Sequence, residues 1–220
     1  MFTDIVFPDK NEKEFLEIAE KLGYKEIIFC YKNKVPELKV DTKIKVHTAL
    51  ISAPKNINRL SNKTHLLIVE SSEKNRQVLE NSKTDILFNL ETLEKKDHMH
   101  FRKSGLNHIL AELASKNNII VGFSFSEILN SRFTDRAMTL GRIMQNIRLC
   151  RKYKVETCFA SFTSDPYEMR AAKDLVSLLI SLGISSNEAK SSLTSASKRI
   201  FSNTKKKSPE YIAEGIELVK

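Results

Sequence analysis

Short apolar runs recur along the chain, and the longer segments between them mix apolar and polar residues with a helical period. There are seven such runs, each four to seven residues long and rich in Ile, Val, Leu or Phe. Continuous apolar runs of this length are typical of parallel strands that are buried on both faces. The predicted strands are residues 4–7, 26–31, 45–51, 65–69, 85–89, 119–123 and 157–161.

The segments between these runs predict helices. Asn11 is a candidate N-cap for a helix that stops at Gly23. Asp165, which is followed by Pro, is a candidate N-cap for a helix that stops at Gly183. The helices expected between strands lie at about residues 12–22, 73–81, 106–113, 134–153 and 166–182.

Beyond residue 183 the chain becomes rich in serine. We expect one more helix over residues 185–202, a polar break at residues 203–209, and a last short helix that starts at Pro209. The break contains three consecutive lysines, at positions 205–207, which fit a solvated loop. A loop that contacts phosphate is the alternative.

Strands that alternate with helices predict an α/β fold with right-handed crossovers. Two architectures fit: a TIM-like barrel of about seven parallel strands with surrounding helices, and a doubly wound open sheet. The second is less favoured because the chain lacks the Gly-rich turn of a dinucleotide site. With 220 residues, we expect one domain over residues 1–220, in which residues 184–220 form a peripheral helical extension.

Composition narrows the class of protein. Hydrophobic residues make up 41% of the chain and charged residues 29%, as in a folded domain with a core. The chain shows neither an apolar run that could span a bilayer nor a basic and then apolar leader, so we expect a soluble, cytoplasmic protein. Cys30, Cys150 and Cys158 are widely spaced, and we expect them to be small buried apolar residues rather than disulfide partners or metal ligands.

The net charge of +9 is concentrated in the second half of the chain. Residues 1–97 carry 17 Lys and Arg against 16 Asp and Glu, whereas residues 98–220 carry 19 against 11. A one-sided basic field is typical of a protein that binds a polyanion, although a basic surface kept for solubility is the alternative. The excess is densest at residues 132–154, where Arg, which can grip phosphate with two N–H groups, outnumbers Lys.

The predicted helix 134–153 can separate these cations from the core. Its apolar residues fall on one side of a helical wheel, and Arg142, Arg148 and Lys152 fall on the opposite arc. We therefore expect these three side chains to face outward. The candidate phosphate-binding residues of this window are Arg132, Arg136, Arg142, Arg148, Arg151 and Lys152.

Two further segments precede predicted helices, whose first N–H groups favour anions. One is residues 98–108, and the other follows the last predicted strand and contains several hydroxyl groups. Helix capping is the alternative role for Asn107, and an ordinary exposed position is the alternative for Arg170. The candidates in these segments are Arg102, Lys103, Asn107, His108, Arg170 and Lys173.

Catalytic chemistry is not indicated by any motif. The chain contains no nucleophile elbow, no P-loop and no Cys/His arrangement typical of catalysis. His98 and His100 could hold a metal ion together, but the other histidines do not gather with acids in a matching pattern. We therefore expect no catalytic residue, no metal ligand and no cofactor on this chain.

Several segments together resemble a known family. They read RKSGLNH at 102–108, IIVGFSF at 119–125 and RAAKDL at 170–175, preceded by FTDIVFP at 2–8 and LGYKEII at 22–28. In order and spacing they resemble protein component 3 of archaeal and eukaryotic ribonuclease P, over residues 1–31 and 97–183. That family has a barrel related to the polymerase-and-histidinol-phosphatase (PHP) hydrolases, so the resemblance favours the barrel over the open sheet.

The resemblance implies an RNA-binding subunit of ribonuclease P, which removes the 5′ leader from precursor tRNA. It implies that the RNA subunit does the chemistry with Mg²⁺, and that this chain shapes and neutralises that RNA. The implied partners are the ribonuclease P RNA, protein component 2 in a heterotetramer with two copies of each chain, and the other protein subunits. A metal-dependent phosphoesterase on a PHP-type barrel, and a basic adaptor that binds protein and no RNA, are the alternatives.

Overall fold

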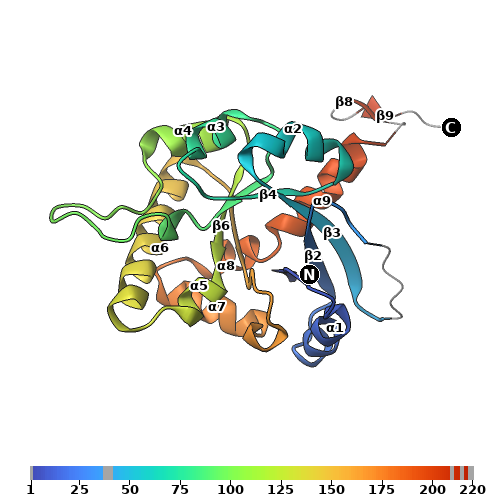
Figure 1. Cartoon of the computed structure of the whole chain (residues 1–220), viewed down its shortest axis with the longest axis horizontal. Coiled ribbons are helices and arrows are strands. Elements are labelled where there is room, and N and C mark those ends of the chain that lie inside the picture. The colour runs from blue at the N-terminus through green and yellow to red at the C-terminus, as the bar shows by residue number, and fades with distance from the viewer. Residues whose placement is uncertain (1, 37–41, 209–210, 214–215, 218–220) are drawn as a thin grey trace.

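Seven parallel strands form the centre of the molecule (Figure 1). The computed structural model describes residues 2–36, 42–208, 211–213 and 216–217. The strands lie side by side in chain order, and the seven predicted runs are confirmed, each within two residues of its expected ends. They are β1 (Thr3–Val6), β2 (Glu26–Lys32), β3 (Lys45–Ser52), β4 (Leu67–Glu70), β5 (Ile86–Phe88), β6 (Ile120–Ser124) and β7 (Thr157–Ala160).

The sheet curves into a nearly closed barrel, because β1 returns to the region just after β7. Phe162 N–H donates to the carbonyl of Ile5, and Phe7 N–H donates to the carbonyl of Thr163, both at 2.8 Å. The buried Asp4 carboxylate strengthens this seam by accepting from the backbone N–H of Ser161 at 2.7 Å and from its hydroxyl at 2.6 Å. The predicted barrel is confirmed, and the open sheet is wrong.

Helices surround the barrel, and several of them connect successive strands. They are α1 (Glu12–Lys21), α2 (Ile57–Leu60), α3 (Asn75–Glu80), α4 (His108–Lys116), α5 (Phe125–Asn130), α6 (Phe133–Tyr153), α7 (Ala172–Ser181), α8 (Ser186–Ser192) and α9 (Ser195–Lys206). Short 3-10 helices lie at η1 (Pro54–Asn56), η2 (Ser61–Lys63), η3 (Leu90–Thr92) and η4 (Pro166–Glu168).

Two apolar clusters hold these layers together. One fills the barrel interior, and the other lies between the barrel and the outer helices. Cys30, Cys150 and Cys158 are all buried and free, which confirms the prediction for the cysteines. Within the described ranges, none of the helices is long and apolar enough to cross a membrane.

Three predictions for the second half of the chain are wrong. Asp165 does cap a helix, by accepting from Tyr167 N–H at 2.9 Å, but this helix is the short η4, and α7 starts only at Ala172. The single helix expected over residues 185–202 is two helices, α8 and α9, interrupted at Leu193 and Thr194. In place of the last helix, β8 (Tyr211–Ala213) and β9 (Ile216–Glu217) form a small antiparallel pair, and Pro209 lies outside the described residues.

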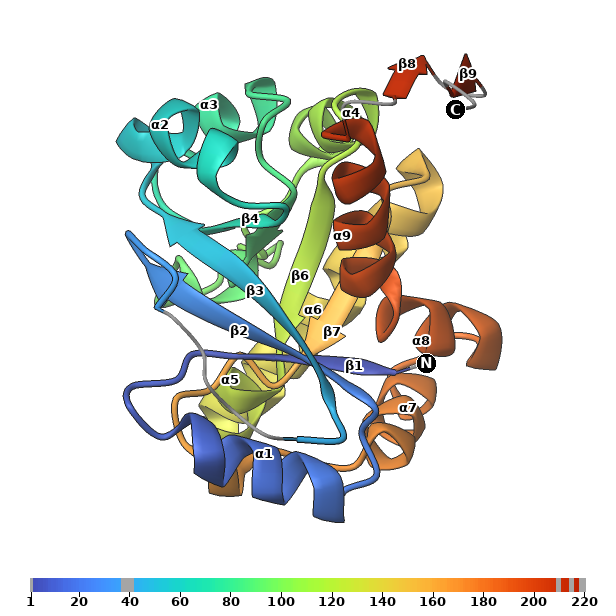
Figure 2. The same cartoon turned by 90° about the vertical axis from the view of Figure 1, so that its right-hand side faces the viewer.

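Helix α9 crosses the end of the barrel at which the strands begin. Arg199 donates to the carbonyl of Asn118 at 2.7 Å, just before β6, and Asn203 donates to the Asp85 carboxylate at 2.8 Å, just before β5. Ala196 and Ile200 of α9 belong to the apolar cluster inside the barrel. This part of the expected extension is therefore not peripheral (Figure 2).

The three consecutive lysines belong to this same helix end. Lys205 and Lys206 are the last residues of α9, and the Lys207 ammonium donates to the carbonyl of Ser61 at 2.8 Å and to that of Thr64. The prediction of a loop is therefore wrong, although all three lysines are exposed to solvent. These contacts are available because α9 extends further than its apolar pattern indicates.

Candidate nucleic-acid interface

Helix α6 is 21 residues long and carries most of the basic window. Its inner side buries Ile143, Ile147 and Cys150 against the barrel. Gly141, Gln145, Arg148 and Lys152 are spaced by three or four residues, so they share one face. We call these four residues, together with the Arg102 side chain that lies on them, the α6 face.

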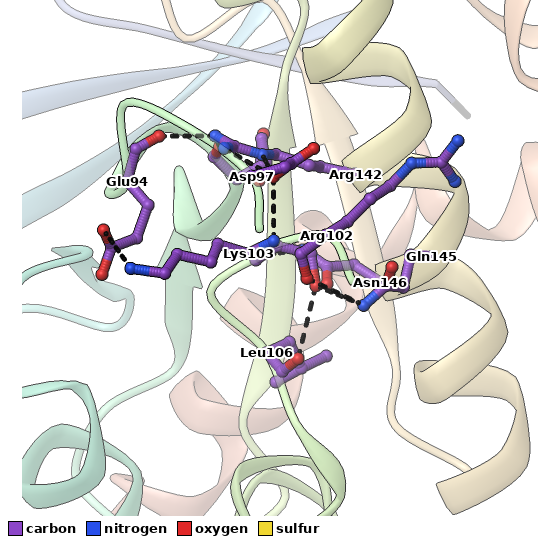
Figure 3. A network of polar contacts seen from close by, with 10 residues as sticks. Glu94, Asp97, Arg102, Lys103, Leu106, Arg142, Gln145 and Asn146 are labelled. Carbon is purple, nitrogen blue, oxygen red and sulfur yellow. Dashed lines mark hydrogen bonds and ion pairs between the residues drawn. The ribbon is translucent and has the colours of Figure 1, made fainter. Parts of the chain in front are cut away.

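Arg142 does not belong to this face, and the prediction that it points outward is wrong. Its side chain is only 2% exposed. It lies 2.7 Å from the Asp97 carboxylate, and it donates to the carbonyls of Glu91 at 2.8 Å and Glu94 at 2.6 Å (Figure 3). The chain between η3 and α4 folds over this arginine, so it is a structural residue.

The segment that leads into α4 is also built for packing. Gly105 has a φ of +75°, and a Cβ there would lie 2.0 Å from the carbonyl oxygen of Leu90, so only glycine fits. Ser104 is buried, and its carbonyl accepts from the Asn146 side chain at 2.7 Å. Asn107 caps α4 by accepting from Leu110 N–H at 2.9 Å, which confirms the capping alternative.

Arg102 emerges from this segment and lies across α6. An ideal Cβ at Gly141 would be 3.1 Å from the Arg102 guanidinium, so the absence of a side chain there lets the guanidinium approach the helix backbone. The Gln145 amide donates to the Arg102 carbonyl at 3.4 Å and to the Ser104 hydroxyl at 3.1 Å, which orients the segment. In Figure 3 the Arg102 side chain points away from the buried cluster around Arg142.

Three cations on the α6 face are free of internal partners. Arg102, Arg148 and Lys152 are exposed, and their charged groups form no hydrogen bond or ion pair with any residue that the structure describes. Lys152 only passes over the ring of its neighbour Tyr153, at 5.3 Å. An unpaired surface cation keeps all its N–H donors available for an oxygen anion.

Some of the remaining candidates form hydrogen bonds or ion pairs within the protein, and others do not. Arg151 pairs with Glu188 at 2.9 Å, and Lys103 pairs with Glu94 at 3.2 Å. Arg136 donates to carbonyls at the end of α5, the nearest being that of Leu129 at 2.8 Å. Arg170 donates to the carbonyl of Met169 at 2.7 Å. Of these remaining candidates, Arg132, His108 and Lys173 are exposed, and their side chains have no hydrogen bond or ion pair with a described residue.

The barrel mouth is the cavity of about 580 Å³ at the carboxyl ends of the strands. Unlike the α6 face, it is lined by acidic and aromatic side chains. We define it by Phe7, Lys32, Glu70, Phe88, Glu127 and Phe162, which line it. The rings of Phe88 and Phe162 stack directly on each other, with their centroids 4.6 Å apart. Burial raises the pKa of Glu127, and the carboxylates of Glu70 and Glu168 raise that pKa further.

Glu91, near Glu127, is fully buried, and neither of its carboxylate oxygens accepts a hydrogen bond from a described residue. Burial raises the pKa of Glu91 to about 7, and the Glu127 charge raises it further. Arg142 and two nearby backbone N–H groups, which do not form hydrogen bonds with the carboxylate, oppose this shift. In the part of the chain that the structure describes, no group of three or more His, Cys, Asp or Glu could hold a metal ion.

Sequence reasoning missed the role of Gly141. The available signal was a glycine inside a strongly helical segment, which is tolerated at a cost and usually has a packing reason. Here that reason is the close approach of Arg102.

Comparisons with known proteins agree with this architecture. The chain matches the model of the family described as RNase P subunit p30 over residues 1–208. It is 30% identical over 166 residues to Ribonuclease P protein component 3 of Methanosarcina acetivorans, covering 74% of this chain and 65% of that protein. It is 34% identical over 152 residues to the protein of the same name from Methanococcus maripaludis strain C5, covering 65% and 63%. The chain thus matches slightly less than two thirds of the length of these relatives.

Solved structures show the same fold. A chain in the cryo-EM structure of archaeal ribonuclease P with mature tRNA superposes with a TM-score of 0.84 at 23% identity, covering 99% of this chain and 98% of that one. An amidohydrolase superposes with a TM-score of 0.55 at 7% identity, covering 93% and 75%. At these identities the likeness concerns the fold alone.

Proposed function

The chain belongs to the RNase P subunit p30 family, and from that premise we propose that it is an RNA-binding protein subunit of ribonuclease P. In this role it supports removal of the 5′ leader from precursor tRNA, while the RNA subunit performs the phosphodiester chemistry with its own Mg²⁺. The relatives named Ribonuclease P protein component 3 support this proposal, and a metal-dependent phosphoesterase is not favoured.

The observation that carries the proposal is the α6 face. Arg102, Arg148 and Lys152 present positive charge on a continuous surface and have no acidic partner among the described residues. An Arg guanidinium binds phosphate through two parallel N–H groups, and Lys adds a point charge. We propose these three as the principal RNA contacts, with Arg132, His108 and Lys173 as exposed secondary candidates.

We further propose that the chain assembles with protein component 2, as two copies of each chain, and with other ribonuclease P proteins. Large apolar side chains outside the α6 face support a protein-binding surface: Phe133 is 90% exposed, and Phe201 is 65% exposed. The proposal implies a cytoplasmic protein that needs no cofactor of its own, because the Mg²⁺ belongs to the RNA.

The test is reconstitution with the cognate RNA and partner proteins at moderate Mg²⁺, followed by cleavage of a precursor tRNA. We expect activity with this chain, much less activity without it, and none from this chain alone. Arg148→Ala should weaken binding of the RNA and leave the circular dichroism spectrum unchanged. Equal activity with and without the chain would refute the proposal, and hydrolysis by the chain with added metal would establish the phosphoesterase instead.

A further inference from the structure

A long loop, residues 94–103, projects from the body of the protein between η3 and α4 (Figure 1). Its base is held rigidly, because the buried Arg142 binds the Asp97 carboxylate and the carbonyl of Glu94 (Figure 3). The Lys103 N–H also donates to Asp97 at 2.8 Å, so both sides of the base are tied together. A loop anchored in this way presents its tip in a defined position.

In this loop the acidic side chains are paired internally and most of the basic ones are not. Its two acids are used internally, since Asp97 binds Arg142 and Glu94 pairs with Lys103 at 3.2 Å. Lys95, Lys96 and Arg102 are exposed, and their charged groups have no hydrogen bond or ion pair among the described residues. The projecting surface therefore carries unpaired positive charge alone, which favours a polyanion as its partner.

The tip displays an aromatic pair instead of burying it. The N–H of His98 donates to the carbonyl of Phe101 at 3.0 Å and closes a tight turn. The two rings lie 4.4 Å apart, inclined by 43°. Phe101 is 60% exposed and Met99 is 93% exposed. A preformed aromatic platform between cations is the combination on which single-stranded RNA bases stack.

We propose that this loop binds unpaired nucleotides of an RNA, with a base stacked on the Phe101 ring and the flanking phosphates held by Lys95 and Lys96. The inference rests on the proposed RNA-binding function, and it adds base stacking at the loop to the phosphate contacts proposed for the α6 face. A protein partner is less favoured, because the apolar tip is small and is surrounded by unpaired cations.

The test is the affinity of the full chain for two probes: an unstructured single-stranded RNA of about 12 nucleotides, and a duplex that contains the same sequence. We expect Phe101→Ala to weaken single-strand binding roughly tenfold, because one stacked base is lost, and to leave duplex binding unchanged. Phe101→Tyr should retain single-strand binding. Met99→Ala removes an even more exposed, non-aromatic apolar side chain from the same loop and is the matched control.

The outcomes separate the two proposals. If the wild-type chain binds neither probe, RNA binding itself fails. If Arg148→Ala weakens binding of both probes while Phe101→Ala changes neither, the α6 face stands and the loop inference is wrong. If Phe101→Ala leaves RNA binding intact but releases a protein subunit from the reconstituted complex, the loop is a protein-docking element and the inference is overturned.

Discussion

The barrel mouth and the α6 face differ in charge, in shape and in how their polar groups are used. At the mouth, burial and the carboxylates of Glu70 and Glu168 raise the pKa of Glu127, in a cavity that two stacked aromatic rings help to line. On the α6 face, Arg102 and Arg148 are exposed on the outside of a helix and have no acid to neutralise them.

Enzymes built on such barrels usually place their chemistry at the carboxyl ends of the strands. In this protein Glu70 and Glu127 line that end, and the surface that we propose for RNA binding lies on an outer helix. Under this proposal the barrel is a rigid support, and RNA contacts are expected where cations have no internal partner. Four predictions test this contrast.

The largest effect is expected on stability, at the base of the α6 face. Arg142→Ala should lower the free energy of unfolding by about 3–5 kcal/mol, because it removes the cation that pairs with Asp97 and the donor to two backbone carbonyls. Arg148→Ala, on the same helix but exposed, should change it by less than about 0.5 kcal/mol. Urea denaturation measures both changes. Equal effects would show that the buried and the exposed arginine contribute equally to stability.

The next effect concerns the acidic side. The pKa of Glu91 is raised from 4.5 to about 7 in the folded protein, so its contribution to stability is complete below about pH 4.5 and is lost as the pH rises through 7. The wild-type protein should lose about 3 kcal/mol of its free energy of unfolding between pH 4.5 and pH 8, and Glu91→Gln should not show this loss. The variant should therefore be the more stable protein at pH 8.

Thermal melts at pH 5 and pH 8 measure this difference. Burial also raises the pKa of Asp4, to about 6. Because Asp4 is present in both proteins, both should keep a smaller dependence of stability on pH. A Glu91→Gln protein that melts below the wild type at pH 8 would mean that the ionised carboxylate has a stabilising partner.

A moderate effect is expected on RNA affinity. Replacing Arg102, Arg148 and Lys152 together by Ala should weaken binding of the cognate RNA by roughly tenfold or more, and should reduce the slope of log affinity against log salt by about 2–3. Replacing three exposed lysines away from this face, Lys21, Lys55 and Lys83, changes the net charge equally and is the control. An equal loss in both triple variants would indicate general charge attraction and not a defined face.

The smallest effect is expected at Gly141. Gly141→Ala should raise helix stability by up to about 1 kcal/mol. It should also weaken RNA binding by less than about threefold, because the new methyl group displaces the Arg102 guanidinium that now lies 3.1 Å away. In an Arg102→Ala background the same substitution should cause no further loss of affinity, which a double-mutant cycle measures.

Much of the fold was predictable because it depends on local patterns. The seven strands follow from short apolar runs, and α6 follows from a long amphipathic segment. Predictions failed where a side chain's surroundings come from distant parts of the chain. The wheel position of Arg142 is opposite the apolar stripe, yet it is buried, because a wheel cannot show that the chain between η3 and α4 covers it.

The candidate site divides in the same way. The sequence by itself determined the order of strands and helices, the excess of cations in its second half and the family resemblance. Only the tertiary structure decided which cations are free: Arg151 faces Glu188 and Arg142 faces Asp97, whereas Arg148 faces solvent. The physical reason is that charge is a property of each residue, but its neutralisation depends on contacts between residues far apart in the chain.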